Sequence, residues 1–323
     1  MTEFSPPKIL RGPHLQTVLS SVGLRRLQVR RNALPFRKAT IEEIADCGDG
    51  VRLLVEHTPP QQNDQPRTVV LFHGWEGSSS STYLLATSTI FWSAGFRVLR
   101  VNLRDHGPSH HLNEDLFHSC RLDEAIGAVS WIRRRFPDDD FFLGGFSLGG
   151  NFCLRIAASA AAPDLRIEKL FAVCPVLDPV ETMHALDGGW VGYRQYFIRK
   201  WRRSLGNKQA AFPDAYDFSD LEHFTSLGRM TEHFVDHYTE YPDLMTYLRG
   251  YAITGDRLKE LSVPSRVLLA ADDPVIPSQG AKRLALSTNL QLDVQAHGGH
   301  CGFLVDYGLR SWLDEWLLRA VED

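Results

Sequence analysis

The chain has 323 residues, which exceeds the usual size of one domain but suits a large α/β enzyme built as a single domain. Hydrophobic residues make up 43% of it and charged residues 23%, so the composition excludes a disordered chain and indicates a sizeable core. The net charge of −4 gives no reason to expect a nucleic acid as partner.

The charges are unevenly distributed, and the N-terminal stretch 1–38 is strongly basic. It contains eight Lys or Arg and a single acid, Glu3, which leaves a net charge of −11 for the rest of the chain. We interpret this stretch as a basic arm that lies across an acidic body. A second interpretation is weak contact with a membrane surface, because apolar side chains lie among these charges, namely Leu15, Val18, Leu19, Val22 and Leu24.

The five cysteines are scattered, odd in number and without CxxC spacing, so they indicate neither a disulfide framework nor a zinc site. Nothing at the N-terminus resembles a secretory signal, and no apolar run approaches the roughly 18 residues of a membrane span. We therefore expect a protein of the reducing cytoplasm.

The predicted elements begin with two β-like stretches, 39–45 and 51–57, which a glycine-rich turn joins into a hairpin. Strands and helices alternate from residue 67. Strands are predicted at 68–72, 96–103, 141–146, 170–174, 265–271 and 290–296, and helices at 82–94, 120–136, 148–161, 278–287 and 309–321. Such alternation is typical of an α/β fold with a mostly parallel sheet and helices on both faces. Ligands bind beyond the carboxyl ends of the strands in such sheets.

Residues 178–257 interrupt the alternation. This stretch is helical in character and holds 14 of the 34 aromatic residues. An insertion at the carboxyl edge of the sheet would form a helical cap or lid on a single domain that spans 1–323. We expect most of its aromatic side chains to pack on the body and a minority to wall an apolar substrate pocket.

A Gly-x-Ser-x-Gly pattern, Gly145 to Gly149, lies between the strand predicted at 141–146 and the helix predicted at 148–161. In this context a serine, here Ser147, becomes a nucleophile at a sharp and strained turn. The positions two residues either side of it must be glycine, because side chains there would collide. The pattern predicts a nucleophilic serine.

A serine nucleophile needs a base and a residue that orients the base. His300 lies in a glycine-rich loop after the last predicted strand, and we prefer it to His297, which directly follows that strand. The third member should follow the preceding strand, where Asp272 and Asp273 are adjacent. We choose Asp273, because side chains alternate in direction and it comes just before the rigid Pro-Val-Ile-Pro turn. Asp272 should then cap the turn or face solvent.

Donors for a developing oxyanion are also required. The backbone N–H of Leu148, next to the nucleophile, should be one. The loop after the first parallel strand, from His73 to Ser78, should supply the other through the N–H of Trp75. Three further histidines, His110, His111 and His118, are expected in a solvated loop. A metal held by His297 and His300 lacks a supporting cluster of cysteine or acidic partners.

Beyond these motifs, the chain resembles the YheT-like branch of the α/β-hydrolases, which also includes plant embryogenesis-associated proteins and eukaryotic abhydrolase-domain phospholipases. The resemblance extends over nearly the whole chain and rests on Arg11–Thr17, His73–Ser78, Asn102–Arg104, Gly145–Asn151, Asp272–Pro274 and Gly298–His300. Within it, His14-Leu15-Gln16-Thr17 is the most discriminating segment. Asp105 replaces the glycine that relatives usually carry, and Pro108–Phe117 departs from their pattern.

The resemblance implies hydrolysis of carboxylic esters by a Ser147–Asp273–His300 triad, without a metal or organic cofactor. We expect esters of short to medium acyl chains. Two alternatives stay open. The same triad could pass the acyl group to another acceptor or act as a lipase or phospholipase, and a silent hydrolase fold could instead bind a ligand or a protein.

Overall fold

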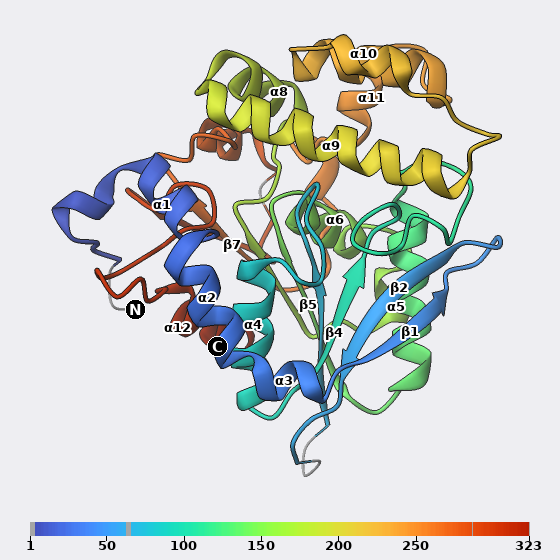
Figure 1. Ribbon diagram of the computed structural model, residues 1–323. Helices are drawn as coiled ribbons and strands as arrows, with labels where there is room; N and C mark the ends of the chain where they lie inside the picture. Colours follow the sequence, from blue (N-terminus) through green and yellow to red (C-terminus); the bar gives the residue numbers. More distant parts are fainter. Residues whose placement is uncertain (1–3, 63–65, 286, 323) are drawn as a thin grey trace.

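The protein is described by a computed structural model that covers residues 4–62, 66–285 and 287–322. Its centre is an eight-stranded sheet with the strand order β1-β2-β4-β3-β5-β6-β7-β8 (Figure 1). The strands are β1 (Ile41–Asp46), β2 (Arg52–Thr58), β3 (Arg67–Phe72), β4 (Arg97–Asn102), β5 (Asp140–Phe146), β6 (Lys169–Val173), β7 (Ser265–Ala270) and β8 (Leu290–Gln295). β1 and β2 form the predicted antiparallel hairpin, and β2 runs antiparallel to β4. The other strands pair in parallel, which confirms the predicted α/β fold.

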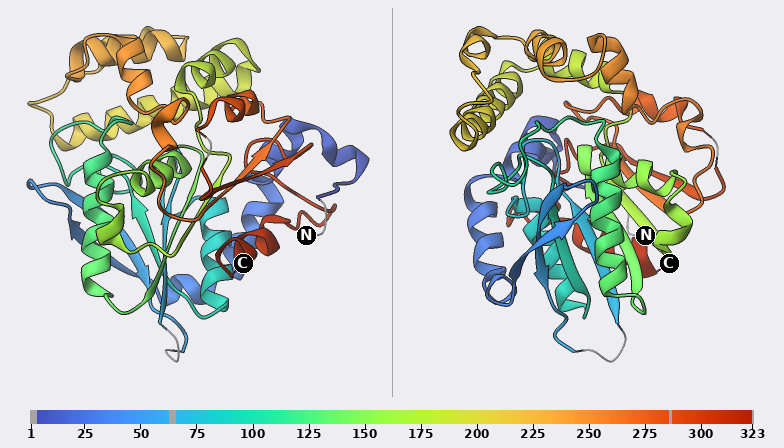
Figure 2. Two further views of the ribbon diagram at one scale, coloured as in Figure 1. Left: turned by 180° about the vertical axis from the view of Figure 1, so that it is seen from behind. Right: turned by 90° about the vertical axis from the view of Figure 1, so that its right-hand side faces the viewer.

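Two helical layers cover the sheet (Figure 2). Helices α5 (Leu122–Arg135) and α6 (Leu148–Ala157) pack on one face, and α4 (Thr82–Ser93) and α12 (Leu313–Glu322) on the other. The short helix α7 (Ala162–Leu165) links α6 to β6. Because both faces are covered, apolar side chains dominate the central strands β3, β5 and β6, and β5 is buried from Phe141 to Phe146.

The segment predicted as a cap lies above the carboxyl edge of the parallel strands, at the top of Figure 1. It consists of α8 (Pro179–Gly188), α9 (Val191–Ala211), η2 (Ser219–His223), α10 (Leu227–Tyr238), α11 (Leu244–Gly250) and η3 (Asp256–Leu258). Asp178 starts α8 as an N-cap, since its carboxylate accepts the Val180 N–H at 2.9 Å and Pro179 occupies the first helical position.

The N-terminal arm folds into η1 (Lys8–Arg11), α1 (Pro13–Leu19), α2 (Gly23–Asn32) and α3 (Leu34–Lys38). It packs on the α4 and α12 face of the body, where Val29 and Phe36 are buried in the same apolar cluster as α12 (Figures 1 and 2). Among the described residues, no helix is both long and apolar enough to cross a membrane.

Three predicted helices differ in the structure. Of the helix predicted at 278–287, the structure has a short 3₁₀ helix, η4 (Ser278–Arg283), which ends because Leu284 is extended and bridges to Gly255; residue 286 lies outside the described residues. The last helix starts at Leu313 and not at residue 309, since Leu309 has φ 61° and Leu304 bridges to Ser311. The helix after Ser147 ends at Ala157, four residues early.

Candidate active site

Ser147 occupies the tight turn between β5 and α6. Its backbone has φ 52° and ψ −122°, which is costly for any residue other than glycine. A Cβ on Gly145 would lie 2.4 Å from the carbonyl carbon of Gly149, and one on Gly149 would lie 2.4 Å from the carbonyl oxygen of Phe72. Both neighbours are backbone atoms that cannot move aside. The turn therefore requires both glycines, as predicted.

His300 and Asp273 are brought together although 27 positions separate them. The Nδ1 of His300 lies 2.8 Å from Oδ2 of Asp273, whose side chain is only 2% exposed. The other oxygen, Oδ1, accepts the N–H groups of Val275 and Ile276 at 2.8 and 2.9 Å, so the carboxylate is fixed in place. Burial disfavours a charged His300, but Asp273 and Cys301 outweigh it and hold its pKa well above the usual value. With Nδ1 directed to the carboxylate, Nε2 is left for a substrate or a nucleophile.

Asp272 and His297, the alternatives considered for the acid and the base, lie beside this pair and not within it. Oδ1 of Asp272 accepts the N–H of Gly299 at 2.9 Å, and its Oδ2 is 3.5 Å from Nδ1 of His297. The expectation that Asp272 caps its own turn or faces solvent is wrong, because its carboxylate holds the loop that carries His300.

The Ser147 turn and the His300 loop meet at the end of β6. The N–H of Ser147 donates to the carbonyl oxygen of Val173 at 2.9 Å. The Sγ of Cys301 lies 3.8 Å from that same oxygen, and the Sγ of Cys174 lies 3.9 Å from the carbonyl oxygen of Gly299. The sheet thus gathers the three predicted catalytic residues at one edge, where parallel α/β sheets bind ligands.

The loop after β3 packs directly on the Ser147 turn, since a Cβ on Gly74 would lie 3.0 Å from the Cβ of Ser147. The amides that flank Trp75 have partners: Gly74 donates to the Tyr83 hydroxyl at 2.9 Å and Glu76 to Nε2 of His106 at 3.1 Å. Within the described part of the chain the Trp75 N–H has no acceptor. Leu148 starts α6, so its N–H has no partner inside that helix. Both predicted oxyanion donors are thus near Ser147 and available.

Two buried histidines fix this loop, and sequence reasoning did not assign them. His106 accepts the Glu76 N–H, and its Nδ1 is 2.7 Å from the carbonyl oxygen of Arg104. His73 accepts the Leu103 N–H at 3.1 Å. Burial lowers the pKa of His73 to about 4 and that of His106 well below its usual value, so both are neutral and structural.

The N-terminal His-Leu-Gln-Thr segment also holds the catalytic loop. Oγ1 of Thr17 accepts the backbone N–H of His300 at 2.8 Å. Gln16 is fully buried; its Nε2 donates to the carbonyl oxygens of Leu10 and Leu304, and its Oε1 accepts the N–H of Leu304. The motif had been recognised only as a family signature. No local sequence signal indicates this role, because the contacts join residues 283 and 288 positions apart.

Cap helix α9 contacts the same loop from above. The Trp75 ring stacks on Phe197 with centroids 5.4 Å apart and meets Trp201 edge-on at 5.4 Å. Lys200 donates to the carbonyl oxygen of Glu76. The part of the cap next to Trp75 is therefore aromatic, while Trp190 and Tyr196 are about half exposed, at 49% and 46%.

An ion pair with Lys208 accounts for the aspartate at position 105, where relatives usually carry glycine. The backbone of Asp105 keeps a left-handed φ of 58°, and its Oδ1 accepts from Nζ of the fully buried Lys208 of α9 at 2.9 Å.

The expectation of a solvated histidine loop is wrong for two of its three members. His110 is buried with Nε2 2.9 Å from the Ser204 hydroxyl, and His118 is buried against Tyr241 and Tyr247, while His111 is exposed.

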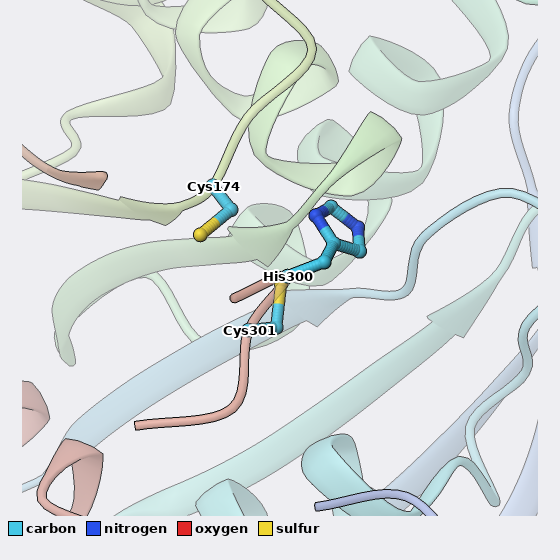
Figure 3. A group of neighbouring side chains, drawn as sticks. All are labelled: Cys174, His300 and Cys301. Carbon is cyan, nitrogen blue, oxygen red and sulfur yellow. The ribbon is translucent and has the colours of Figure 1, made fainter. Parts of the chain in front are cut away.

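Sequence spacing indicates no cysteine partners for a metal at His297 and His300, whereas the fold brings two cysteines to His300 without His297. Cys174 and Cys301 are distant in the sequence, but both side chains lie beside the His300 imidazole (Figure 3). Spacing within the sequence could not show this cluster, because β6 and the His300 loop come together only in the folded sheet.

Comparison with known proteins agrees with this architecture. The sequence pattern of the alpha/beta hydrolase fold matches residues 67–307, so the chain belongs to the alpha/beta hydrolase family. Within the family it is 26% identical to YheT of Escherichia coli (strain K12), over 99% of this chain and 94% of the relative. It is 22% identical to human monoacylglycerol lipase ABHD2, over 98% of this chain and 79% of the relative.

Solved structures with the same fold include an esterase, Pf2001 of Pyrococcus furiosus. It aligns over 100% of this chain and 97% of its own with a TM-score of 0.57 and 14% identity. A membrane phospholipase A described as a bacterial virulence factor aligns over 96% and 91% with a TM-score of 0.56 and 13% identity. At these identities the likeness concerns the fold alone.

Proposed function

We propose that the protein is a serine hydrolase that cleaves carboxylic esters of short to medium acyl chains. The observation that carries the proposal is the 2.8 Å contact between His300 Nδ1 and Asp273 Oδ2, at the sheet edge where Ser147 sits in its strained turn. The names of two relatives, a candidate esterase and a monoacylglycerol lipase, support the reaction class.

In the proposed reaction Ser147 Oγ attacks the ester carbonyl while Nε2 of His300 takes the hydroxyl proton. The N–H groups of Trp75 and Leu148 stabilise the oxyanion. The tetrahedral intermediate collapses, and the alcohol leaves with the proton that His300 returns. Water, deprotonated by His300, then attacks the acyl-enzyme and releases the acid, and Ser147 recovers its proton. Asp273 keeps the imidazole oriented and stabilises its protonated form throughout.

A series of nitrophenyl esters of increasing chain length tests the substrate class. We expect turnover with an optimum at short to medium chains, because the aromatic contacts of Trp75, Phe197 and Trp201 bound the space beside the oxyanion donors. Ser147→Ala should abolish turnover. Competing alcohols or amines in the assay separate hydrolysis from acyl transfer, since a transferase would form the new ester or amide.

A lipase acting at a lipid surface is a second candidate, and one observation favours it. On α2 the apolar side chains of Leu24 and Leu27 are 59% and 66% exposed, among the exposed Arg26, Arg30 and Arg31. Exposed apolar side chains with cations around them suit an anionic membrane surface.

The same ester series, run with anionic and with neutral vesicles, distinguishes the two candidates. A long-chain optimum with activation by anionic vesicles, lost in Leu24→Gln/Leu27→Gln, would establish the lipase. Val294→Gln is the matched control, since that side chain is 53% exposed on the edge strand β8 and not on α2. No vesicle effect in wild type would leave the esterase proposal standing alone.

A further inference from the structure

Two thiols and the His300 imidazole form a compact group of soft ligands. One possible ligand atom from each of Cys174, His300 and Cys301 lies within 4.8 Å of the other two (Figure 3). Both cysteines are buried, Cys174 completely and Cys301 at 8% exposure. Ester hydrolysis as proposed uses neither thiol.

The backbone holds the thiols in position at a conformational cost. Cys174 has φ 44° and Cys301 has φ 60°, in the left-handed region that residues with a Cβ seldom occupy. Each thiol points across to the other segment, Cys174 toward the carbonyl oxygen of Gly299 at 3.9 Å and Cys301 toward that of Val173 at 3.8 Å. Sulfur donates such hydrogen bonds weakly, so the contacts leave both sulfur atoms able to take a stronger partner.

The separations fit a metal ion. In a tetrahedral site with metal–sulfur bonds of about 2.3 Å and metal–nitrogen bonds of about 2.0 Å, neighbouring ligand atoms are roughly 3.5–3.8 Å apart. Ligand atoms within 4.8 Å of one another reach this spacing by movements of about 1 Å at most.

We propose that Cys174, Cys301 and His300 form an inhibitory site for a thiophilic divalent cation of the Zn²⁺ and Cd²⁺ class. Two thiolates and an imidazole are the ligand set that such ions prefer. Binding forms two metal–sulfur bonds and one metal–nitrogen bond and releases the two thiol protons together with the extra proton of a protonated His300, so the two thiolates neutralise the bound dication. The ion takes a ring nitrogen that the proposed reaction needs, either Nδ1 in place of Asp273 or Nε2 in place of Ser147, and so stops ester hydrolysis. This inhibition rests on the proposed function, whereas metal binding itself does not.

Cd²⁺ tests the site directly, through the ultraviolet absorption that appears when thiolates bind it. Titration of the reduced wild-type protein should saturate this absorption at one ion per chain. Cys174→Ala and, as a second variant, Cys301→Ala should lose it. Cys153→Ala is the matched control, because it removes another fully buried thiol, from α6, and should bind as wild type does.

Turnover measurements with Zn²⁺ complete the test. Wild type and Cys153→Ala should lose ester turnover when Zn²⁺ is added and regain it with a chelator, whereas Cys174→Ala should resist the ion. Ser147→Ala should still bind one Cd²⁺, which separates a failure of this site from a failure of the proposed function. Saturable Cd²⁺ absorption that persists in both Cys174→Ala and Cys301→Ala would overturn the proposal. So would an absence of binding in wild type, with oxidants linking the two cysteines instead.

Discussion

Two adjacent aspartates, Asp272 and Asp273, hold different parts of the loop that carries His300. Asp273 contacts the His300 ring, while Asp272 contacts the backbone N–H of Gly299 one residue earlier. The two residues lie in a turn closed by the hydrogen bond from the Asp273 N–H to the carbonyl oxygen of Ala270, and their carboxylates reach different parts of the loop. Asp273 is therefore the aspartate that contacts the imidazole, as predicted from the sequence.

Exchanging each aspartate for asparagine tests this division. Asp273→Asn should lower kcat by about 10⁴-fold, because an amide opposite Nδ1 favours the wrong imidazole tautomer and cannot stabilise its charge. Asp272→Asn is the matched control and should change kcat by less than about tenfold, since its amide oxygen can still accept the Gly299 N–H. Steady-state kinetics on a nitrophenyl ester measures both. A larger effect at Asp272 would reverse the assignment.

Glu76 gives the oxyanion loop a pH-dependent stability. Burial raises the pKa of its carboxyl to about 8, with Lys200 opposing the shift. The folded state therefore holds the proton more tightly than the unfolded state, and stability falls as the pH rises from about 4.5 to about 8. In Glu76→Gln this decline is absent, so between pH 5 and 8 the unfolding free energy of wild type should drop by about 3–4 kcal/mol relative to the variant. Urea denaturation at several pH values measures it, and parallel pH profiles would refute it.

Sequence reasoning identified Ser147, Asp273 and His300 because each follows a predicted strand in the chain order of the fold family. The roles of Gln16 and Thr17 could not be found in this way. Thr17 acts on His300 across 283 positions, and no periodicity or turn signal connects the two segments. Such contacts are set by tertiary packing alone.

The connection between β5 and α6 requires the backbone of α6 to lie very close to the end of β3. A methyl group on Gly149 would meet the carbonyl oxygens of Phe72 and His73 at 2.4 and 2.5 Å, so Gly149→Ala must displace β3 from α6. We expect a loss of about 3 kcal/mol or more in unfolding free energy. Gly206→Ala is the control, because that glycine lies inside α9 with open space around it and alanine should stabilise the helix by up to about 1 kcal/mol. Equal effects in urea denaturation would contradict this account.

The junction of α9 with the body is a buried ion pair. Nζ of Lys208 contacts Asp105 and the carbonyl oxygens of Asn113 and Asp115 at 2.6–3.0 Å. Lys208→Met should cost about 3 kcal/mol of unfolding free energy, because it leaves a buried carboxylate without its partner. Adding Asp105→Asn should recover part of the loss. The exposed Lys282→Met should change stability by less than about 0.5 kcal/mol, and a comparable loss there would refute the buried-pair explanation.

The predicted elements are correct where strands and helices alternate. They are wrong where a local helical pattern competes with a bridge to a distant segment. Residues 278–287 have helical spacing, but the bridge between Leu284 and Gly255 holds the chain extended after one short 3₁₀ segment. Similarly, the bridge between Leu304 and Ser311 delays the last helix. Both bridges join segments whose pairing the local sequence does not encode.

The candidate site is assembled from the sheet, the N-terminal arm and the cap. The sheet supplies Ser147 and Asp273, the N-terminal α1 holds the His300 loop through Thr17, and α9 packs on Trp75. The basic arm is thus a structural part of the site, which its charge alone did not indicate. Its contact with a membrane surface stays a prediction.

Labelling with a fluorophosphonate, followed by mapping of the modified peptide by mass spectrometry, tests the central claim most directly. A strained serine beside an oriented imidazole should react to one adduct per chain, on Ser147, and Ser147→Ala should remain unlabelled while folded. Absence of an adduct in the folded wild-type protein, or the same adduct yield in Ser147→Ala, would contradict the assignment of Ser147 as the nucleophile.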